Sequence, residues 1–134
     1  MRIHNATISR SIAIGLLGLA SATLGGCVAL AVGAAAGVGT YAYIKGELTD
    51  FEEASLDRAY EATQAAIKDL EFTVKDQAKD SLQARIVASE ADKTEVKIVL
   101  ESKGEKLTKF SIRVGVFGDE ARARLIMDKI KKHL

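Results

Sequence analysis

Two hydrophobic periods alternate along the chain after residue 40. Between residues 55 and 70, apolar side chains recur about every 3.6 positions, which predicts an amphipathic helix with Ser55 as its N-cap. The positions on its apolar face are Leu56, Ala59, Tyr60, Thr63, Ala66, Ile67 and Leu70. A second stripe with the same period predicts a helix that follows Asp119. Its apolar positions are Ala123, Ile126, Met127, Ile130 and Leu134.

Between these helices the period changes to two, which is typical of strands with one buried face. A strand is predicted to open at 72–74 and to end in the polar residues 75–80. Three further alternating segments occupy 82–88, 96–100 and 110–116. Short polar turns separate them, so the strands are expected to be antiparallel neighbours in a meander.

A looser alternation over 41–51 predicts one more strand before the first helix. The expected order is therefore β-α-β-β-β-β-α. The sequence predicts an α+β fold, in which an antiparallel meander sheet of four to five strands carries an N-terminal and a C-terminal helix on one face. This two-layer domain would span residues 41–134, which is enough chain to bury one core.

The first 26 residues have the organisation of a secretory signal peptide. A polar, positively charged lead is followed by residues 11–23, which carry no charge and are mostly apolar. The basic side chains of the lead are Arg2, His4 and Arg10. This order predicts export of the chain and cleavage of residues 1–26.

The segment Leu24-Gly25-Gly26-Cys27 resembles the lipobox of bacterial lipoproteins. Small residues at Gly25 and Gly26 let an extended backbone enter a peptidase, and the thiol of Cys27 is the nucleophile that takes the diacylglycerol. Two or more acyl chains hold a protein stably on a membrane. Val28 stands where an Asp would retain a lipoprotein in the inner membrane, so the resemblance implies an outer-membrane location facing the periplasm.

Residues 28–44 form a second uncharged stretch that admits more than one interpretation. Residues 27–40 are interpreted as the lipidated Cys plus a Gly/Ala-rich tether. Together with residues 11–27, however, the stretch is long enough to span a bilayer, and Gly33 and Gly37 form a G-x-x-x-G step suited to close helix packing. Interfacial packing or self-association is the third alternative.

Composition excludes several classes of function. Of the 19 Lys and Arg residues, two lie before residue 27, so the processed chain would hold 17 basic and 18 acidic side chains and a net charge of −1. Nucleic-acid binding requires a basic excess. One Cys and two His residues make a Cys-rich zinc site or a His-dependent catalytic site unexpected. We therefore predict no nucleic-acid partner, no metal, no cofactor and no enzymatic activity.

Three segments of the chain closely resemble one bacterial lipoprotein family, the domain-of-unknown-function family 3568. They occupy residues 39–48, 55–63 and 111–121, and the R-V-G-x-F-G-D-E pattern within the last is the most specific. The resemblance implies a small lipid-anchored envelope protein with no catalytic residues to transfer.

Two groups of residues are candidates for binding. Arg85, Lys97 and Arg113 fall on the polar face of the predicted strands and are candidate partner-binding residues. Gly118, Asp119 and Glu120 stand where the last strand turns into the last helix. Backbone amides at this helix start could hold an anion. In the alternative, structural interpretation, the glycines shape the turn, Asp119 caps the helix and Arg113 pairs with a carboxylate.

Charge is also unevenly distributed over the last helix. From Arg122 to Lys132 there are five bases and one acid, Asp128. Such a face could meet anionic head groups or an acidic partner, or it could be a solvated helix surface whose C-terminal cations complement the helix dipole.

Taken together, these patterns predict a lipid-anchored envelope protein with a non-enzymatic, protein-binding or accessory domain. The expected partner is an envelope protein or a second copy of the chain. A structural membrane role that uses the Gly/Ala segment for self-association is one alternative, and a small-ligand carrier is another.

Overall fold

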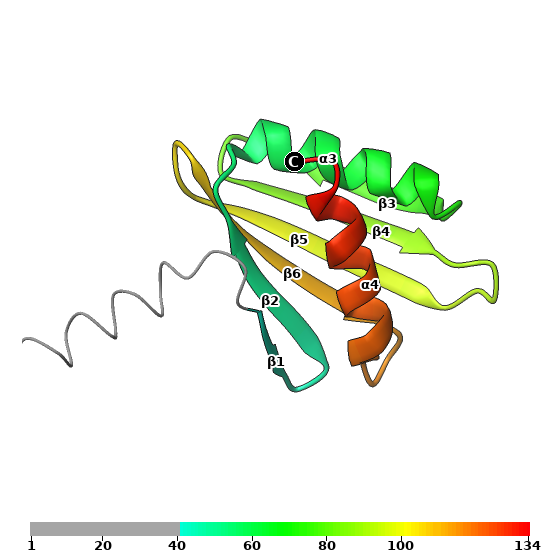
Figure 1. Cartoon of the computed structure of the whole chain (residues 1–134). Coiled ribbons are helices and arrows are strands. Elements are labelled where there is room, and N and C mark those ends of the chain that lie inside the picture. Colours follow the sequence, from blue (N-terminus) through cyan, green and yellow to red (C-terminus); the bar gives the residue numbers. More distant parts are fainter. Residues whose placement is uncertain (1–40) are drawn as a thin grey trace, which may run out of the picture. The chain divides into compact units, whose positions relative to one another are not determined.

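A computed structural model of the chain describes residues 41–134, which form six strands and two helices (Figure 1). The strands are β1 (Ala42–Ile44), β2 (Glu47–Glu52), β3 (Thr73–Lys79), β4 (Gln83–Ser89), β5 (Glu95–Gly104) and β6 (Leu107–Val114). The helices are α3 (Leu56–Asp69) and α4 (Glu120–Lys131). The predicted signal peptide, the lipobox with Cys27 and the tether lie outside the described residues.

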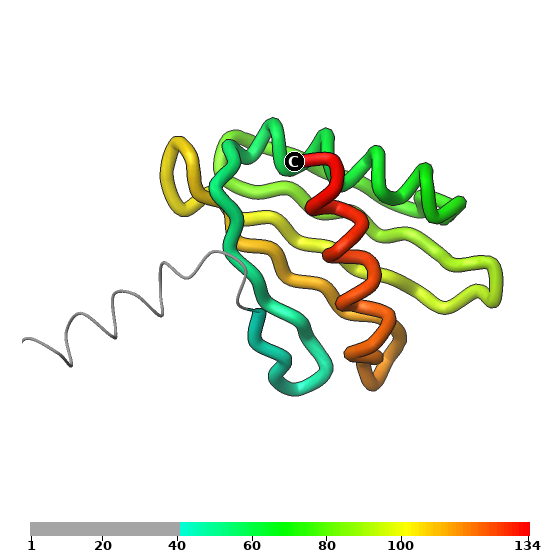
Figure 2. The backbone as a smooth tube through the Cα atoms, in the orientation of Figure 1, coloured from blue at the N-terminus to red at the C-terminus, as the bar shows by residue number. Residues whose placement is uncertain are grey.

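The six strands form one antiparallel sheet in the order β1-β2-β6-β5-β4-β3. Strands β3 to β6 are successive neighbours, so the predicted meander is confirmed. Strand β2 pairs with β6, and α3 carries the chain from this side of the sheet to the opposite edge at β3. The β1–β2 turn and the β6–α4 turn consequently reach the same end of the sheet, as the backbone trace in Figure 2 shows.

The prediction of a single strand over 41–51 is wrong. This segment is a β-hairpin, in which Tyr43 lies opposite Leu48 across a turn formed by Lys45 and Gly46. Both turn residues have positive φ, 52° and 82°, as a two-residue hairpin turn requires. Because the alternation of apolar and polar residues continues across this turn, the hydrophobic pattern does not indicate that the strand ends there. The sheet therefore has six strands, against the four to five predicted.

Strand β3 is longer than its hydrophobic pattern indicates. It continues to Lys79, through residues predicted to lie outside the strand, and all seven of its residues are exposed. The register shifts between Val74 and Asp76, which leaves Lys75 as an extra residue. Charged side chains and bulges are common on edge strands, so pairing with β4, and not burial, defines this strand. Strand β6, in contrast, ends at Val114, two residues earlier than predicted.

Both helices cover the same face of the sheet, as predicted (Figure 1). Helix α3 packs on β4 and β5, and α4 packs on β6 and β2. Neither is long and apolar enough to cross a membrane, a finding limited to residues 41–134. Between the layers lies one core, whose largest fully buried apolar side chains are Phe110, Leu48, Ile86, Ile98, Leu100, Ile112, Ile126, Met127 and Ile130.

One carboxylate lies in this core. Asp50 of β2 is fully buried, and its Oδ1 accepts a hydrogen bond from the Phe51 backbone N–H at 2.8 Å. The ammonium of Lys131, at the end of α4, lies 2.6 Å from Asp50 Oδ2 and 3.0 Å from Glu52 Oε1. These two oxygens have no other hydrogen-bond partner. Lys131 therefore supplies the counter-charge for both carboxylates and ties α4 to β2.

Candidate functional site

A groove runs along α4 and reaches the C-terminal end of α3. It consists of two hollows that share Leu70 and Leu125, with volumes of about 410 and 570 Å³. The first is lined by Leu70, Phe72, Glu90, Ala91, Asp92, Arg122, Leu125 and Ile126. The second is lined by Leu70, Ala121, Arg124, Leu125, Asp128, Lys129 and Lys132. We call the two hollows together the helix groove.

Leu125 is the central apolar side chain of the helix groove. It lies beside the buried stripe of α4 and is 56% exposed, although its neighbour Ile126 is buried. Leu70 and Phe72 face it from the end of α3 and are only partly buried against the core. A large exposed side chain in an apolar hollow is a feature that binding surfaces share.

The end of α3 positions Phe72 through a Schellman motif. The Phe72 N–H donates to the carbonyl of Ile67, and the Glu71 N–H donates to that of Lys68, each at 3.1 Å. Glu71 adopts the left-handed conformation that this motif requires, with φ 56°. The reversal turns the chain beneath Leu70 and places the Phe72 ring in the groove.

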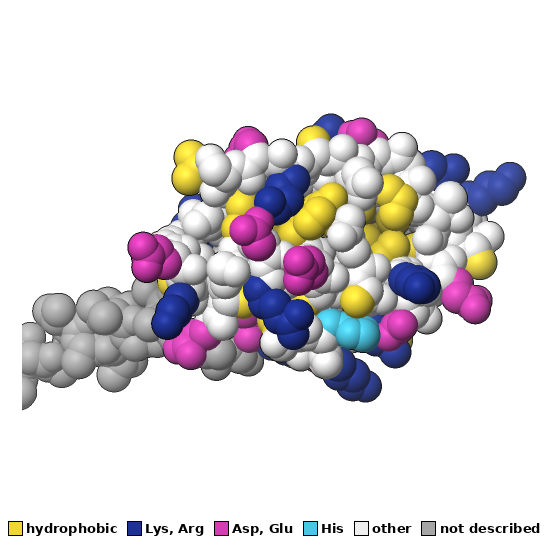
Figure 3. Space-filling view, turned by 90° about the horizontal axis from the view of Figure 1, so that it is seen from above, with side chains coloured by type: hydrophobic (Ala, Val, Ile, Leu, Met, Phe, Trp, Pro, Cys, Tyr) yellow, Lys and Arg dark blue, Asp and Glu magenta, His cyan; other side chains and the backbone are white. Residues whose placement is uncertain are grey.

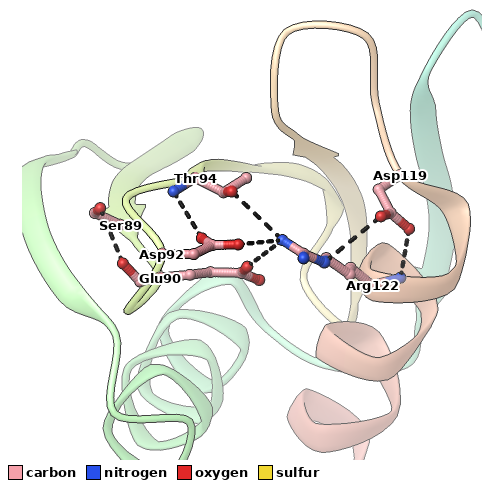
Figure 4. Close-up of polar contacts among 6 residues, drawn as sticks. All are labelled: Ser89, Glu90, Asp92, Thr94, Asp119 and Arg122. Atoms are coloured by element: carbon pink, nitrogen blue, oxygen red, sulfur yellow. Dashed lines mark hydrogen bonds and ion pairs between the residues drawn. The ribbon is translucent and has the colours of Figure 1, made fainter.

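The end of the groove at the β4–β5 turn is acidic (Figure 4). The guanidinium of Arg122 lies 2.7 Å from Glu90, 3.1 Å from Asp92 and 3.5 Å from Asp119. Three carboxylates therefore surround one cation, and the cluster retains a net negative charge. Hydrogen bonds from Thr94, reinforced by Arg122, lower the pKa of Asp92 below its usual 3.8.

The opposite end of the groove is basic. Lys129 and Lys132 lie there with Arg124 and a single carboxylate, Asp128. Arg124 pairs with Glu120 and stacks over the ring of Tyr41, 4.3 Å from its centroid. Neither lysine has an ion-pair partner within residues 41–134. The groove thus has an apolar middle and ends of opposite charge. On the face of the molecule seen in Figure 3, charged and hydrophobic side chains are likewise intermingled.

The helix stripe of five bases does not act as a uniform basic face. Arg122 is enclosed by carboxylates, and Lys131 is tied to Asp50. Arg124 is paired with Glu120, so Lys129 and Lys132 are the bases of this stripe whose charge is left for a partner.

The structure brings Arg85, Lys97 and Arg113 together on the open face of the sheet, away from the helices. Lys97 lies directly opposite Arg113 on the neighbouring strand. Arg85, however, forms an ion pair with Asp76 at 2.7 Å. Lys97 alone of the three has neither an ion pair nor a side-chain hydrogen bond within the described part of the chain.

Arg113 holds two turns together. Its guanidinium donates to the carbonyl oxygens of Val116 at 3.0 Å and Lys45 at 2.8 Å. The expected pairing with a carboxylate is therefore wrong, because the β1–β2 turn, which the sequence pattern did not reveal, presents a backbone acceptor there instead.

The residues at the start of α4 have structural partners. Asp119 is the N-cap, and its Oδ1 accepts from the Arg122 backbone N–H at 3.0 Å. Glu120 pairs with Arg124 in the first two turns. Gly118 has φ 82°, and a Cβ there would overlap the backbone of Gly46. These contacts match the structural interpretation of the turn.

Sequence reasoning missed the residues that form the helix groove. A signal for Leu125 was present, since it is an apolar residue outside the stripe of its helix. The spacing of Asp92 and Thr94 also suits an Asx turn, in which Asp92 Oδ1 accepts from the Thr94 N–H at 2.9 Å. No signal linked Glu90 to Arg122, which lie 32 positions apart. Within residues 41–134, no group of three or more His, Cys, Asp or Glu residues could hold a metal.

Comparison with known families shows to which family the chain belongs. Residues 10–133 match the family described as "Protein of unknown function (DUF3568)". The chain belongs to this family. No curated protein matches it significantly. The description of DUF3568 assigns no activity, so the groove and the surfaces of this DUF3568 member are the features that bear on its role.

Proposed function

We propose that this DUF3568 protein is a lipid-anchored bacterial envelope protein whose domain binds a protein partner in the helix groove. The anchor is supported by Leu24-Gly25-Gly26-Cys27, which follows a basic lead and an apolar run and contains the only Cys of the chain. Val28 supports the outer membrane as its location.

The single observation that supports binding is the layout of the helix groove. An amphipathic segment recognised there would place apolar side chains against Leu70, Phe72 and Leu125. A cation at one end of that segment would meet Glu90 and Asp92, and an anion at its other end would meet the basic end of the groove. The apolar area buried in the groove would by itself give little specificity, whereas the opposite charges at its two ends fix the direction of the bound segment.

The polar groups of the groove suit ion pairing better than proton transfer. General acid–base catalysis works best with a pKa near the working pH. The pKa of Asp92 is instead lowered from 3.8, and Glu90 is held by Arg122. His133 lies outside the groove lining and contacts Asp69 at 2.7 Å. These observations favour a binding role over an enzymatic one.

The anchor is tested by the intact mass of the protein extracted from bacterial membranes, beside a Cys27→Ala variant. We expect the wild-type mass to lack residues 1–26 and to include acyl chains, and the variant to lose both changes. An uncleaved, unmodified wild-type chain would contradict the anchor and favour a true membrane segment between residues 11 and 44.

The groove is tested by placing a photo-crosslinking amino acid at position 125 in living bacteria, and at Leu82 as a control. Leu82 is also an exposed leucine, but it lies in the β3–β4 turn, outside the groove. We expect one protein to crosslink at position 125 only, and the double change Lys129→Glu and Lys132→Glu to abolish the product. Equal crosslinking at both positions, or none at 125, would contradict the proposal.

A small-ligand carrier is the second candidate, because the groove has an apolar floor around Leu125. It predicts a bound small molecule in native mass spectra of the extracted protein, which Leu125→Asp removes. A purely structural membrane role predicts instead that Gly33→Leu and Gly37→Leu are the damaging changes. Binding through the open sheet face predicts that Lys97→Glu abolishes function while the groove variants retain it.

A further inference from the structure

The turn between β6 and α4 presents two apolar side chains to solvent. Val116 is 83% exposed and Phe117 is 93% exposed, which makes them the most exposed large apolar residues of the described chain. Ile44, 66% exposed, lies at the end of β1 beside the neighbouring turn. We call these three residues the apolar tip. Exposed groups of this kind mark interaction sites more often than isolated apolar residues do.

The backbone that carries the apolar tip is fixed from both sides. Gly115 and Gly118 flank it with φ of 71° and 82°. The backbones of Gly46 and Gly118 approach so closely that neither position has room for a Cβ. Arg113 bridges the two turns through its bonds to Lys45 and Val116. The side chains therefore project from a rigid base and are not a loose loop that could fold back onto the core.

The apolar tip lies near the start of the described chain. Tyr43 of β1 approaches Gly118 with its hydroxyl group, and Tyr41 stacks on Arg124 in the first half of α4. Only the 14 residues 27–40 separate Tyr41 from the end of the predicted signal peptide. Fully extended, that stretch reaches about 50 Å at most. An acylated Cys27 would thus keep the tip close to the bilayer, where a high effective concentration makes a weak contact sufficient.

We propose that the apolar tip inserts into the bilayer that holds the lipid anchor. This inference rests on the anchor of the proposed function for its proximity to the membrane, and it adds a second contact that orients the domain. The charged residues next to the tip in the sequence are of both signs, Lys45 and Arg113 against Glu47 and Asp119. Burial of apolar surface therefore drives the contact, and we expect the tip to insert into a bilayer of zwitterionic lipids without anionic head groups.

The test uses the absence of Trp from the chain. The protein with Phe117→Trp is expressed in bacteria from its full sequence, extracted from the membranes and reconstituted into phosphatidylcholine vesicles whose acyl chains carry bromine, a quencher of indole emission. The matched control is Leu82→Trp. Leu82 is 71% exposed and lies at the opposite sheet end, where its carbonyl accepts from the Ser102 N–H. Both substitutions replace exposed side chains and leave the core intact.

We expect blue-shifted emission and roughly twofold or stronger quenching for Phe117→Trp relative to Leu82→Trp, because an indole at the acyl boundary meets the bromines. A second variant, Val116→Asp in the Phe117→Trp background, should abolish the difference. Equal quenching at the two positions overturns the proposal. So does an unquenched Phe117→Trp indole combined with crosslinking of that position to a protein, which would make the tip a protein contact.

The intact mass of the same reconstituted sample separates this inference from the proposed function. An acylated chain with equal quenching at both positions retains the anchor and overturns only the tip. An unmodified chain with selective quenching at position 117 retains the tip and overturns only the anchor.

Discussion

At the scale of single residues, Asp50 is the side chain that the hydrophobic pattern misplaces. It occupies a core-facing position of β2 between Leu48 and Glu52, where an apolar residue would be expected. A buried carboxylate without a counter-charge destabilises the folded state. Removing one partner of a buried ion pair therefore costs more stability than replacing both partners by apolar residues. Lys131 is therefore a structural residue, although its position among the bases of the last helix is typical of a solvated lysine.

Replacing Lys131 by Met should lower the free energy of unfolding by about 3 kcal/mol, because Asp50 and Glu52 then lose their shared cation. Urea unfolding followed by circular dichroism measures this. Lys132→Met, one position further along and exposed, is the control and should change stability by less than about 0.5 kcal/mol. Equal losses in the two variants would contradict the buried pairing.

At the scale of elements, ends and turns position the groove. The Schellman motif after α3 contains Glu71 in a conformation that glycine adopts more easily. The β4–β5 turn brings Glu90 and Asp92 to the start of α4. Both features use backbone geometry and long-range ion pairs, to which hydrophobic periodicity is insensitive.

Glu71→Gly should stabilise the domain by about 1 kcal/mol, because a left-handed residue with a Cβ is strained and glycine is not. For a domain of this size the melting temperature should rise by roughly 4–8 °C. Glu71→Ala, which removes the charge but keeps the Cβ, is the control and should give no comparable gain. A glycine variant that melts at or below the wild-type temperature would contradict the left-handed conformation of Glu71.

The Asp92 cluster predicts a pH dependence. Because the pKa of Asp92 is lowered in the folded protein, its stabilising contribution is fully present above about pH 3.8 and is lost as the pH falls through the lower, folded-state pKa. Asp92→Asn should therefore lose less stability than the wild type on acidification below pH 3.8. Asp128→Asn, on the exposed side of α4, serves as the control, and thermal melts at several pH values provide the comparison.

These elements also show how much of the fold could be predicted from the sequence alone. The period of two and the period of 3.6 identified both helices, their N-caps at Ser55 and Asp119, and the four-stranded meander. The hairpin at Lys45 and Gly46 was missed because a two-residue turn does not interrupt the alternation. The polar half of β3 was missed because both of its faces are solvated. The groove depends on contacts between distant segments, so no local pattern could reveal it.

At the scale of the whole molecule, a backbone contact joins the first hairpin to the turn before the last helix. Gly46 belongs to the first hairpin and Gly118 precedes the last helix, and they touch without side chains between them. This contact, with Arg113 across it, closes the sheet end that carries the apolar tip. It explains why two glycines 72 positions apart in sequence both lack room for a Cβ.

Gly118→Ala should destabilise the domain more than Gly115→Ala. The two glycines have similar positive φ, 82° and 71°, so each alanine meets a similar backbone strain of about 1 kcal/mol. Only at Gly118 would the new Cβ collide with the Gly46 backbone, whereas at Gly115 it makes ordinary contact with Thr94 at 3.6 Å. We expect an additional loss of about 1–3 kcal/mol for Gly118→Ala in urea unfolding. Equal losses would argue against the contact.

The two edges of the sheet differ from each other, and both bear on whether neighbouring copies of the domain can pair edge to edge. One edge is β1, only three residues long, and the other is β3, whose seven exposed residues include Lys75, Asp76 and Lys79 and a bulge. Neither edge offers a long, flat template for a further strand. If the proposed lipid anchor confines copies of the domain to two dimensions, their local concentration rises, and the short β1 edge and the charged, bulged β3 edge are then expected to keep neighbouring sheets from pairing edge to edge.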